Sequence, residues 1–337
     1  MKYLYQTQRV VQAPDLLGDY WFNSEPMSIQ SLRGNTVLLF FWDFSFPSSL
    51  QFLPLIVDLH ARYADLGLTC IGVHSPEFPF GKTTNNIEAA LARHGVSFPV
   101  IADNEKRIAD AYHIPANPIV VLIGPNGNVY DQITSFSALM RSERSIQYLL
   151  RQSGFYGELP MLEIFEGWDR NIFEMNTGYL HGSLGNSEGY SPELTASYED
   201  PKYYVWKKFY LHGEWLAERN SCTFKGTPNE GYIIARIDAY AMQILASASG
   251  KSSVKVEVDD APVRLADMGH DVKKDKQGNT LFHVADPKLV SVLKIKDEGD
   301  HRVKIIPLTT DVSFYLISYE YKSAYENSQT NGLIQKN

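Results

Sequence analysis

The sequence predicts an α/β domain followed by an all-β sandwich domain. In the first half, apolar strand-like runs alternate with helix-like segments, which is the pattern of a sheet covered by helices. From Gly231 onward, short strand-like runs recur between turn signals, as in a sandwich or barrel. The 337 residues exceed the length of one typical domain, so two domains are expected.

The first predicted strands and the helix between them are the clearest elements of the first half. Val37–Trp42 is a continuous apolar run, which predicts a strand buried on both faces. Ser48–Leu66 has apolar residues at helical spacing and ends at Gly67, a residue suited to a helix C-terminus. Leu68–Val73 is a second apolar strand. The remaining predictions are helices at Asn86–His94, with Asn85 as N-cap, at Glu105–Tyr112 and at Ala138–Gln152, a strand at Ile119–Ile123, and a hairpin turn at Pro125–Asn128 leading into a strand from Val129.

The second half changes in texture after Gly154. Val254, Val256 and Val258 alternate with polar residues, which predicts a half-buried strand. Further strands are expected at Val290–Ile295, Val303–Ile306 and Phe314–Tyr319, with a turn at Lys276–Asn279. The predicted organisation is therefore an α/β domain at 12–154, a β-sandwich at 155–322 and a flexible tail at 323–337.

Charge and hydropathy exclude two classes of partner. The formal net charge is −8, so no basic patch is available to neutralise phosphates, and nucleic acid is not an expected partner. Met1–Leu17 lacks the basic and apolar regions of a signal peptide. The longest apolar run, Thr36–Trp42, is too short to span a bilayer. We therefore expect no membrane association and a cytoplasmic location.

Cysteines and histidines give no sign of a metal or cofactor site. The two cysteines, Cys70 and Cys222, are expected to be buried free thiols. The nine histidines are scattered without the spacing of zinc ligands, so neither a metal nor a cofactor is predicted. A calcium site in the second domain stays open, because carboxylate and carbonyl ligands leave weak sequence patterns.

Several motifs of the first half resemble the thioredoxin-like domain of the TlpA and redoxin group. The segment 41–54 reads Phe-Trp-Asp-Phe-Ser-Phe-Pro-Ser-Ser-Leu-Gln-Phe-Leu-Pro and looks like the active-site strand and helix of that group. Residues 72–78 read Gly-Val-His-Ser-Pro-Glu-Phe and are similar to a run in the periplasmic region of the DipZ family. Asn117-Pro118 looks like the cis-proline loop.

The resemblance extends into the second half and covers roughly residues 12–322. Four segments look like the β-sandwich that follows thioredoxin in the DipZ family: 179–182, 211–215, 256–262 and 269–272. That module is similar to carbohydrate-binding folds of jelly-roll type. The resemblance therefore implies a thioredoxin-like domain followed by a carbohydrate-binding-like sandwich.

The departure from that family lies at the residues that would carry the chemistry. The family pattern implies Cys-x-x-Cys at positions 46 and 49, where this chain has Phe46 and Ser49. Disulfide exchange needs a thiolate to attack a disulfide sulfur, which neither side chain supplies. We therefore predict a redox-silent binding or scaffold protein that holds a peptide or partner protein in the former active-site groove. The groove residues are expected to be Trp42, Phe46, Pro47, Ser49, His74, Glu77, Asn117 and Pro118.

The groove residues have individual expectations. Phe46 is expected to fill the groove rather than to anchor a partner as an exposed ring. Ser48 or Ser49 is expected to cap the following helix. Pro118 is expected to be cis and to present the preceding backbone to an extended peptide.

Two alternatives from other functional classes remain. One is a thiol-disulfide oxidoreductase or peroxidase that uses Cys70 or the thiol of a partner. The other is glycan binding by the second domain, on an aromatic platform formed by Tyr203, Trp206, Tyr210 and Trp215.

Overall fold

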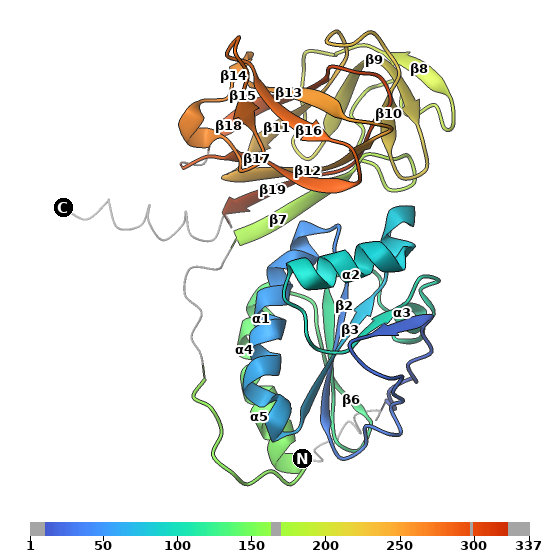
Figure 1. The fold of residues 1–337 in the computed structure, drawn as a ribbon, viewed down its shortest axis with the longest axis vertical. Coiled ribbons are helices and arrows are strands. Elements are labelled where there is room, and N and C mark those ends of the chain that lie inside the picture. The colour runs from blue at the N-terminus through green and yellow to red at the C-terminus, as the bar shows by residue number, and fades with distance from the viewer. Residues whose placement is uncertain (1–10, 163–169, 297–298, 323–337) are drawn as a thin grey trace, which may run out of the picture. The chain divides into compact units, whose positions relative to one another are not determined.

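The computed structural model describes residues 11–162, 170–296 and 299–322 (Figure 1). The chain divides into two compact units, Met1–Glu166 and Gly167–Asn337. This division falls later in the chain than the boundary predicted after Gly154. The predicted tail at 323–337 lies outside the described residues.

The first unit contains a six-stranded mixed sheet in the order β1-β4-β3-β2-β5-β6. Neighbours β2, β3 and β4 are parallel, and the other pairings are antiparallel. The strands are β1 (Tyr20–Phe22), β2 (Thr36–Trp42), β3 (Leu68–His74), β4 (Val100–Ala102), β5 (Ile119–Ile123) and β6 (Val129–Ile133). The helices are α1 (Pro47–Tyr63), α2 (Thr84–Arg93), α3 (Arg107–Ala111), α4 (Phe136–Arg141) and α5 (Glu143–Gln152), with short 3-10 helices η1 (Ala64–Leu66) and η2 (Pro79–Lys82). The predicted α/β class is confirmed.

Alternation along β2 explains why its residues from Val37 to Trp42 are all apolar. Leu38, Phe40 and Trp42 pack into a core with residues of α1, α4 and α5. The intervening side chains of β2 pack into a second core, on the face that carries α3. Figure 1 shows α1, α4 and α5 on one side of the sheet and α3 on the other. Because both faces are covered, no position of β2 needs to be polar.

The predicted helix at Ala138–Gln152 is wrong in one respect, because the structure contains two helices there. Ser142 lies between α4 and α5, and its hydroxyl donates to the carbonyl of Leu139 (2.7 Å). Serine competes for local backbone partners in this way, which favours a break in the helix. The predicted stops at Gly67 and Gly95 are confirmed, since both glycines have positive φ (102° and 64°).

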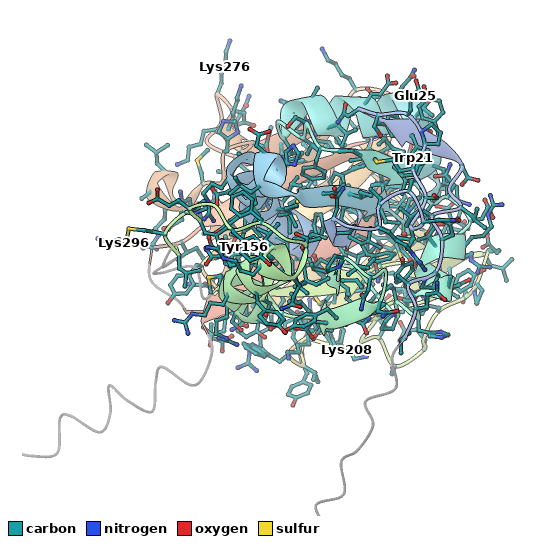
Figure 2. All side chains as sticks on the ribbon, turned by 90° about the horizontal axis from the view of Figure 1, so that it is seen from below. Trp21, Glu25, Tyr156, Lys208, Lys276 and Lys296 are labelled. Carbon is teal, nitrogen blue, oxygen red and sulfur yellow. The ribbon has the colours of Figure 1, made fainter. Side chains whose placement is uncertain are left out.

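The second unit is all β, as predicted, and every strand pairing given for it is antiparallel. Its strands are β7 (Arg170–Asn176), β8 (Thr195–Tyr198), β9 (Phe209–Ala217), β10 (Cys222–Phe224), β11 (Tyr232–Asp238), β12 (Ala241–Ala248), β13 (Ser252–Val258), β14 (Ala261–Pro262), β15 (Lys273–Lys274), β16 (Thr280–Val284), β17 (Lys288–Lys294), β18 (Asp300–Pro307) and β19 (Val312–Lys322), with a 3-10 helix η3 (Leu265–Asp267). The exposed Lys276 lies in the turn between β15 and β16, as the sequence predicts (Figure 2).

Strand β9 belongs to two sheets, and one glycine permits this. Residues 209–212 pair with β11, whereas 213–216 pair with β8. Gly213, at the change of partner, has φ +87°, and a Cβ there would lie 3.0 Å from the Cα of Gly231. Side chains of both sheets, such as Ile233 of β11 and Ile317 of β19, share one apolar core. This arrangement agrees with a two-layer sandwich, while the jelly-roll connectivity stays a prediction.

Among the described residues, no helix combines the length and the apolar character that a membrane span requires.

Candidate functional site

The predicted groove residues of the first unit gather at one edge of its sheet. In the strand register, Trp42 lies opposite His74, and His74 lies opposite Ala102. Phe41 lies opposite Ile119, so Pro118 follows next to Trp42. The turn after β2, the loop after β3 and the segment before β5 therefore meet at this edge. This is where ligands bind in open α/β sheets.

A buried carboxylate, Asp43, ties the turn after β2 to the loop after β3. Its Oδ1 accepts from the amide of Ser45 (2.9 Å) and from the Ser45 hydroxyl. Its Oδ2 accepts from the amide of Glu77 (2.8 Å). The amide of Asp43 itself donates to Oγ of Ser49 (3.2 Å). These bonds fix the backbone that carries Phe44 and Phe46.

Five rings cover this edge in a continuous series, called here the aromatic arc: Phe46, Phe78, Phe80, Phe44 and His74. Phe46 stacks on Phe78 with 5.5 Å between centroids and 6° between planes, and Phe78 stacks on Phe80 at 5.5 Å and 13°. Phe80 contacts Phe44 at 6.5 Å, and Phe44 stacks on His74 at 5.0 Å and 12°. Phe78 is buried, while the other three phenyl rings keep part of their surface exposed. Phe46 therefore packs into the arc and still presents some apolar surface.

His74 is fully buried, and neither of its ring nitrogens has a hydrogen-bond partner. Trp42 meets its ring edge-on at 5.5 Å. Burial lowers the pKa of His74, and the nearby Asp43 carboxylate only partly opposes that shift. The burial of His74 therefore favours its neutral imidazole, and Nε2 lies 3.8 Å from Oδ1 of Asp43.

The remaining groove residues have structural partners of their own. Glu77 forms an ion pair with Lys106 (2.6 Å). The side-chain amide of Asn117 donates to the carbonyl of Ser75 (2.9 Å). The Asn117–Pro118 peptide bond is cis, as predicted. Pro47 begins α1.

The prediction that Ser48 or Ser49 caps α1 is wrong. Phe46 occupies the N-cap position, and its side chain makes no capping hydrogen bond. Pro47 starts the helix before the serines, because its fixed φ suits the first helical position. Ser49 is instead buried inside the first turn, where its hydroxyl accepts from the amide of Asp43.

Neither cysteine is placed for redox chemistry. Cys70 and Cys222 are free and have only 1% and 0% of their surfaces exposed. Burial raises the pKa of both thiols, which disfavours the nucleophilic thiolate. Cys70 packs in the core on the α1 side of the sheet, opposite Leu38. This placement contradicts the use of Cys70 as a reactive thiol in the folded chain.

The aromatic platform predicted in the second unit is not formed. Trp215 is buried in the core, 5.0 Å from Phe224, because alternation along β9 points it inward. Tyr210 is also buried and is covered closely by Gly185, where a Cβ would lie 2.3 Å from the ring. Trp206 is half-buried, and only Tyr203 of the four is largely exposed. Four rings therefore do not share one accessible face.

The loop before β9 is held by a second buried carboxylate, Asp200. It accepts from Lys202 (2.8 Å), Tyr204 (2.9 Å) and Tyr232 (2.7 Å). Burial alone would raise the pKa of Asp200, but these hydrogen bonds lower it to about 2. The residues described by the structure contain no group of three or more His, Cys, Asp and Glu side chains arranged to hold a metal ion.

Sequence reasoning missed four residues that build the site: Asp43, Phe44, Phe78 and Phe80. A signal for the rings was available, because phenylalanines at 44, 46, 78 and 80 alternate within two turn segments of otherwise small or polar residues. Asp43 carried no comparable signal, since its partners Ser45 and Glu77 come from two separate loops.

The fold and this site define a thioredoxin-like redoxin domain joined to an all-β domain, and comparisons with known families agree. Residues 11–132 match the AhpC/TSA family, and residues 177–319 match the thioredoxin like C-terminal domain. The first domain is thus an AhpC/TSA redoxin domain. The all-β second domain matches the family that is described as the thioredoxin like C-terminal domain. The predicted relation to the redoxin group is confirmed.

Individual relatives share parts of this chain. Protein DipZ of Mycobacterium tuberculosis (strain CDC 1551 / Oshkosh) is 27% identical over 262 residues, which cover 75% of this chain and 37% of DipZ. NHL repeat-containing protein 2 of Gallus gallus is 32% identical over 133 residues, covering 38% of this chain and 18% of that protein. The thiol-disulfide oxidoreductase ResA of Halalkalibacterium halodurans is 28% identical over 105 residues, which cover 31% of this chain and 57% of ResA. The chain spans less than two thirds of the length of each relative.

Proposed function

We propose that this chain is a redox-silent member of the redoxin group that binds a peptide or a partner protein at the edge of its first sheet. The observation that carries this proposal is the lack of reactive sulfur at that edge. Phe46 and Ser49 stand where the family pattern places cysteines, and both cysteines of the chain lie in apolar cores.

The chemistry of disulfide exchange supports this proposal. A thiolate must attack one sulfur of a disulfide and form a mixed disulfide. Phe46 has no nucleophilic atom, and the Ser49 hydroxyl is buried against the amide of Asp43. With the thiol pKa of Cys70 raised by burial, the folded chain offers no sulfur to a substrate.

The surface at the same edge supports binding. Phe44, Phe46 and Phe80 are half-buried rings that keep some apolar area exposed, and the Asn117–Pro118 segment reaches the same sheet edge. Apolar anchors next to accessible backbone are the features that extended peptides use. The Glu77–Lys106 ion pair supplies a polar rim.

A thiol titration combined with insulin reduction tests the redox half of the proposal. We expect the native chain to react negligibly with Ellman's reagent, to release two thiols per chain only in denaturant, and to reduce insulin no faster than boiled protein. The Phe46→Cys/Ser49→Cys double variant is the matched control, because it restores sulfur to the same frame. It should gain reactive thiols and insulin reduction, and substantial reduction by the parent chain would overturn the proposal.

A displayed peptide library tests the binding half. Peptides selected on the parent chain should bind the Phe46→Ala variant at least tenfold more weakly, because a half-buried anchor ring is lost. The Tyr130→Ala variant is the matched control, since Tyr130 is an exposed ring on β6 of the same unit. Selected peptides that bind both variants equally, or a failure to select any, would count against a site at this edge.

The second candidate is a thiol-disulfide oxidoreductase that works with the thiol of another protein. Its support is the similarity to a relative named thiol-disulfide oxidoreductase. This candidate requires that the chain accelerates insulin reduction by an added dithiol such as dithiothreitol. A rate equal to that of dithiothreitol alone would remove it.

A further inference from the structure

The His74 imidazole lies in a closed apolar box at the sheet edge. Phe44 stacks on one face and Trp42 meets the ring edge-on. The 3-10 turn of η2 approaches from a third side, where a Cβ on Gly81 would lie 3.8 Å from Cε1 of His74. The ring is fully buried, and neither nitrogen is hydrogen-bonded. Such a box suits a neutral imidazole and penalises an imidazolium.

Asp43 is the carboxylate that faces this box, and both of its oxygens already accept hydrogen bonds. Nε2 of His74 is 3.8 Å from Oδ1, which is too far for a hydrogen bond and close enough for strong attraction once the ring is charged. Oδ1 holds Ser45, and Oδ2 holds the amide of Glu77. These are the bonds that position Phe44 and Phe46.

The other charged groups around the box are engaged elsewhere. They form the ion pairs Glu77–Lys106 (2.6 Å) and Lys82–Glu105 (2.9 Å), and Asp103 accepts from Ser75 Oγ and from the amides of Ile108 and Ala109. Among the charged groups on the elements around His74, Asp43 is therefore the acceptor that a proton on the ring would reach with least rearrangement.

We propose that residues 43–46 form an acid-operated latch, in which a proton taken up by His74 draws the Asp43 carboxylate away from Ser45 and Glu77. The proton comes from solvent, no covalent bond changes, and an Nε2–H···Oδ1 hydrogen bond replaces the bonds that Asp43 makes to the turn. Phe44 and Phe46 then leave the aromatic arc. At neutral pH the latch is closed, because burial holds the pKa of His74 below its ordinary value of 6.5. This inference goes beyond the proposed binding function, because the opening is a property of the chain alone.

Amide hydrogen exchange on the whole chain, measured by NMR from pH 8 to pH 5, tests the latch. Protection factors, corrected for the intrinsic exchange rate, should fall for the amides of Ser45 and Glu77 by about tenfold per pH unit below about 6.5, since one proton is taken up on opening. The amide of Leu39, in the centre of the sheet, should keep its protection and serves as the reference for global unfolding.

Two substitutions separate His74 from other histidines. His74→Gln should leave the protection of Ser45 and Glu77 independent of pH in this range. His94→Gln is the matched control, because burial also lowers the pKa of His94, which follows the end of α2. It should retain the full tenfold dependence. A pH dependence that survives His74→Gln would overturn the latch, and so would one that is lost in His94→Gln.

The parent chain also provides a test that needs no variant. The Cε1 proton of His74 should titrate below pH 6.5 in the NMR spectrum. A titration at or above 6.5, or a parallel loss of protection at Leu39, would overturn the proposal even if His74→Gln fails to fold. None of these outcomes depends on peptide binding, so the latch and the proposed function can fail independently.

Discussion

Two of the buried carboxylates in the first domain, Glu143 and Asp43, are satisfied in opposite ways. Glu143 of α5 accepts from the guanidinium of Arg62 and from the hydroxyl of Tyr63, both on α1. Gln147 extends this network by donating to the same hydroxyl (2.7 Å). Asp43, at the sheet edge, accepts only from neutral groups and faces an imidazole with no hydrogen bond.

The two carboxylates therefore differ in their expected response to pH: the Glu143 network is structural, and the Asp43 centre is the one expected to respond. In the Glu143 network, burial and the hydrogen bond to Glu143 raise the pKa of Tyr63 to about 12, so its proton stays in place at ordinary pH. The network therefore joins α1 to α5 without responding to pH. Beside Asp43, the imidazole of His74 has no hydrogen-bond partner, and histidine is the side chain that takes up a proton closest to neutral pH. The responsive centre lies at the edge where we propose that partners bind.

Removing the Glu143 carboxylate should have the largest effect on stability. Glu143→Ala removes one of the two carboxylates that pair with Arg62, Asp58 being the other, and leaves the buried Tyr63 hydroxyl without its acceptor, so the free energy of unfolding should fall by about 3–4 kcal/mol. Urea denaturation measures it. Glu143→Gln keeps the shape and an acceptor, and should lose less. A loss below about 1 kcal/mol for the alanine variant would show that the network is not structural.

Removing the Asp43 carboxylate should lower the free energy of unfolding by less than removing that of Glu143. Asp43→Ala leaves the amides of Ser45 and Glu77 without their acceptor, and each unpaired buried donor costs about 1–3 kcal/mol. Because Glu77 is half-exposed and water can reach it, we expect a total of about 2–3 kcal/mol. Asp110→Ala, at an exposed position of α3, is the control and should change stability little. Equal losses for Glu143→Ala and Asp43→Ala would erase the distinction between the two centres.

The pH dependence of stability should be specific to the Asp43 centre. The pKa of His74 is lowered in the folded state, so the unfolded chain binds more protons below the ordinary value of 6.5. Stability due to this group is therefore full above about pH 6.5 and is lost as the pH falls, by about 1.4 kcal/mol per pH unit. His60 and His94, whose pKa values burial also lowers, contribute in the same direction. The measurement is thus the difference between the parent and His74→Gln in urea melts from pH 8 to pH 5. A difference in the free energy of unfolding between the parent and His74→Gln that stays constant with pH would contradict this prediction.

Phe46 should contribute modestly to stability, although we propose a leading role for it in binding. Its ring is half-buried and stacked on Phe78, so Phe46→Ala should cost about 1 kcal/mol. Thermal unfolding measures the change. Phe78→Ala, at a buried ring of the same arc, is the contrasting variant and should cost about 3 kcal/mol or more. If Phe46→Ala costs as much as Phe78→Ala, Phe46 is a core residue and its exposed surface is incidental.

The smallest effect is expected at the outer rim. Lys82 and Glu105 form an ion pair between exposed side chains, and such pairs contribute about 0–1 kcal/mol. Lys82→Ala should therefore leave unfolding and the pH profile within experimental error. A shift of the His74 titration in this variant would mean that the rim contributes to the latch.

Much of the fold could be predicted because apolar periodicity follows burial. Strand β5 matches the predicted Ile119–Ile123, and β2 and β3 differ from prediction by one residue at one end. Errors arose at helix ends: Ser142 competes for local backbone, Pro47 starts α1 before the serines, and α2 begins at Thr84, so the predicted N-cap Asn85 lies inside the helix and that prediction is wrong. Alternation along β9 would have placed Trp215 in the core, but the aromatic composition of that region suggested a surface platform instead.

The sequence by itself determined the domain classes, the positions of the main strands and the missing sulfur, because periodicity and residue identity are properties of one chain segment at a time. Only the tertiary structure decided that Asp43 bridges two loops, that Phe78 and Phe80 complete an arc with Phe44 and Phe46, and that His74 has no hydrogen bond. Those properties depend on which segments distant in the sequence become neighbours, and on how burial changes the free energy of a charge once they do.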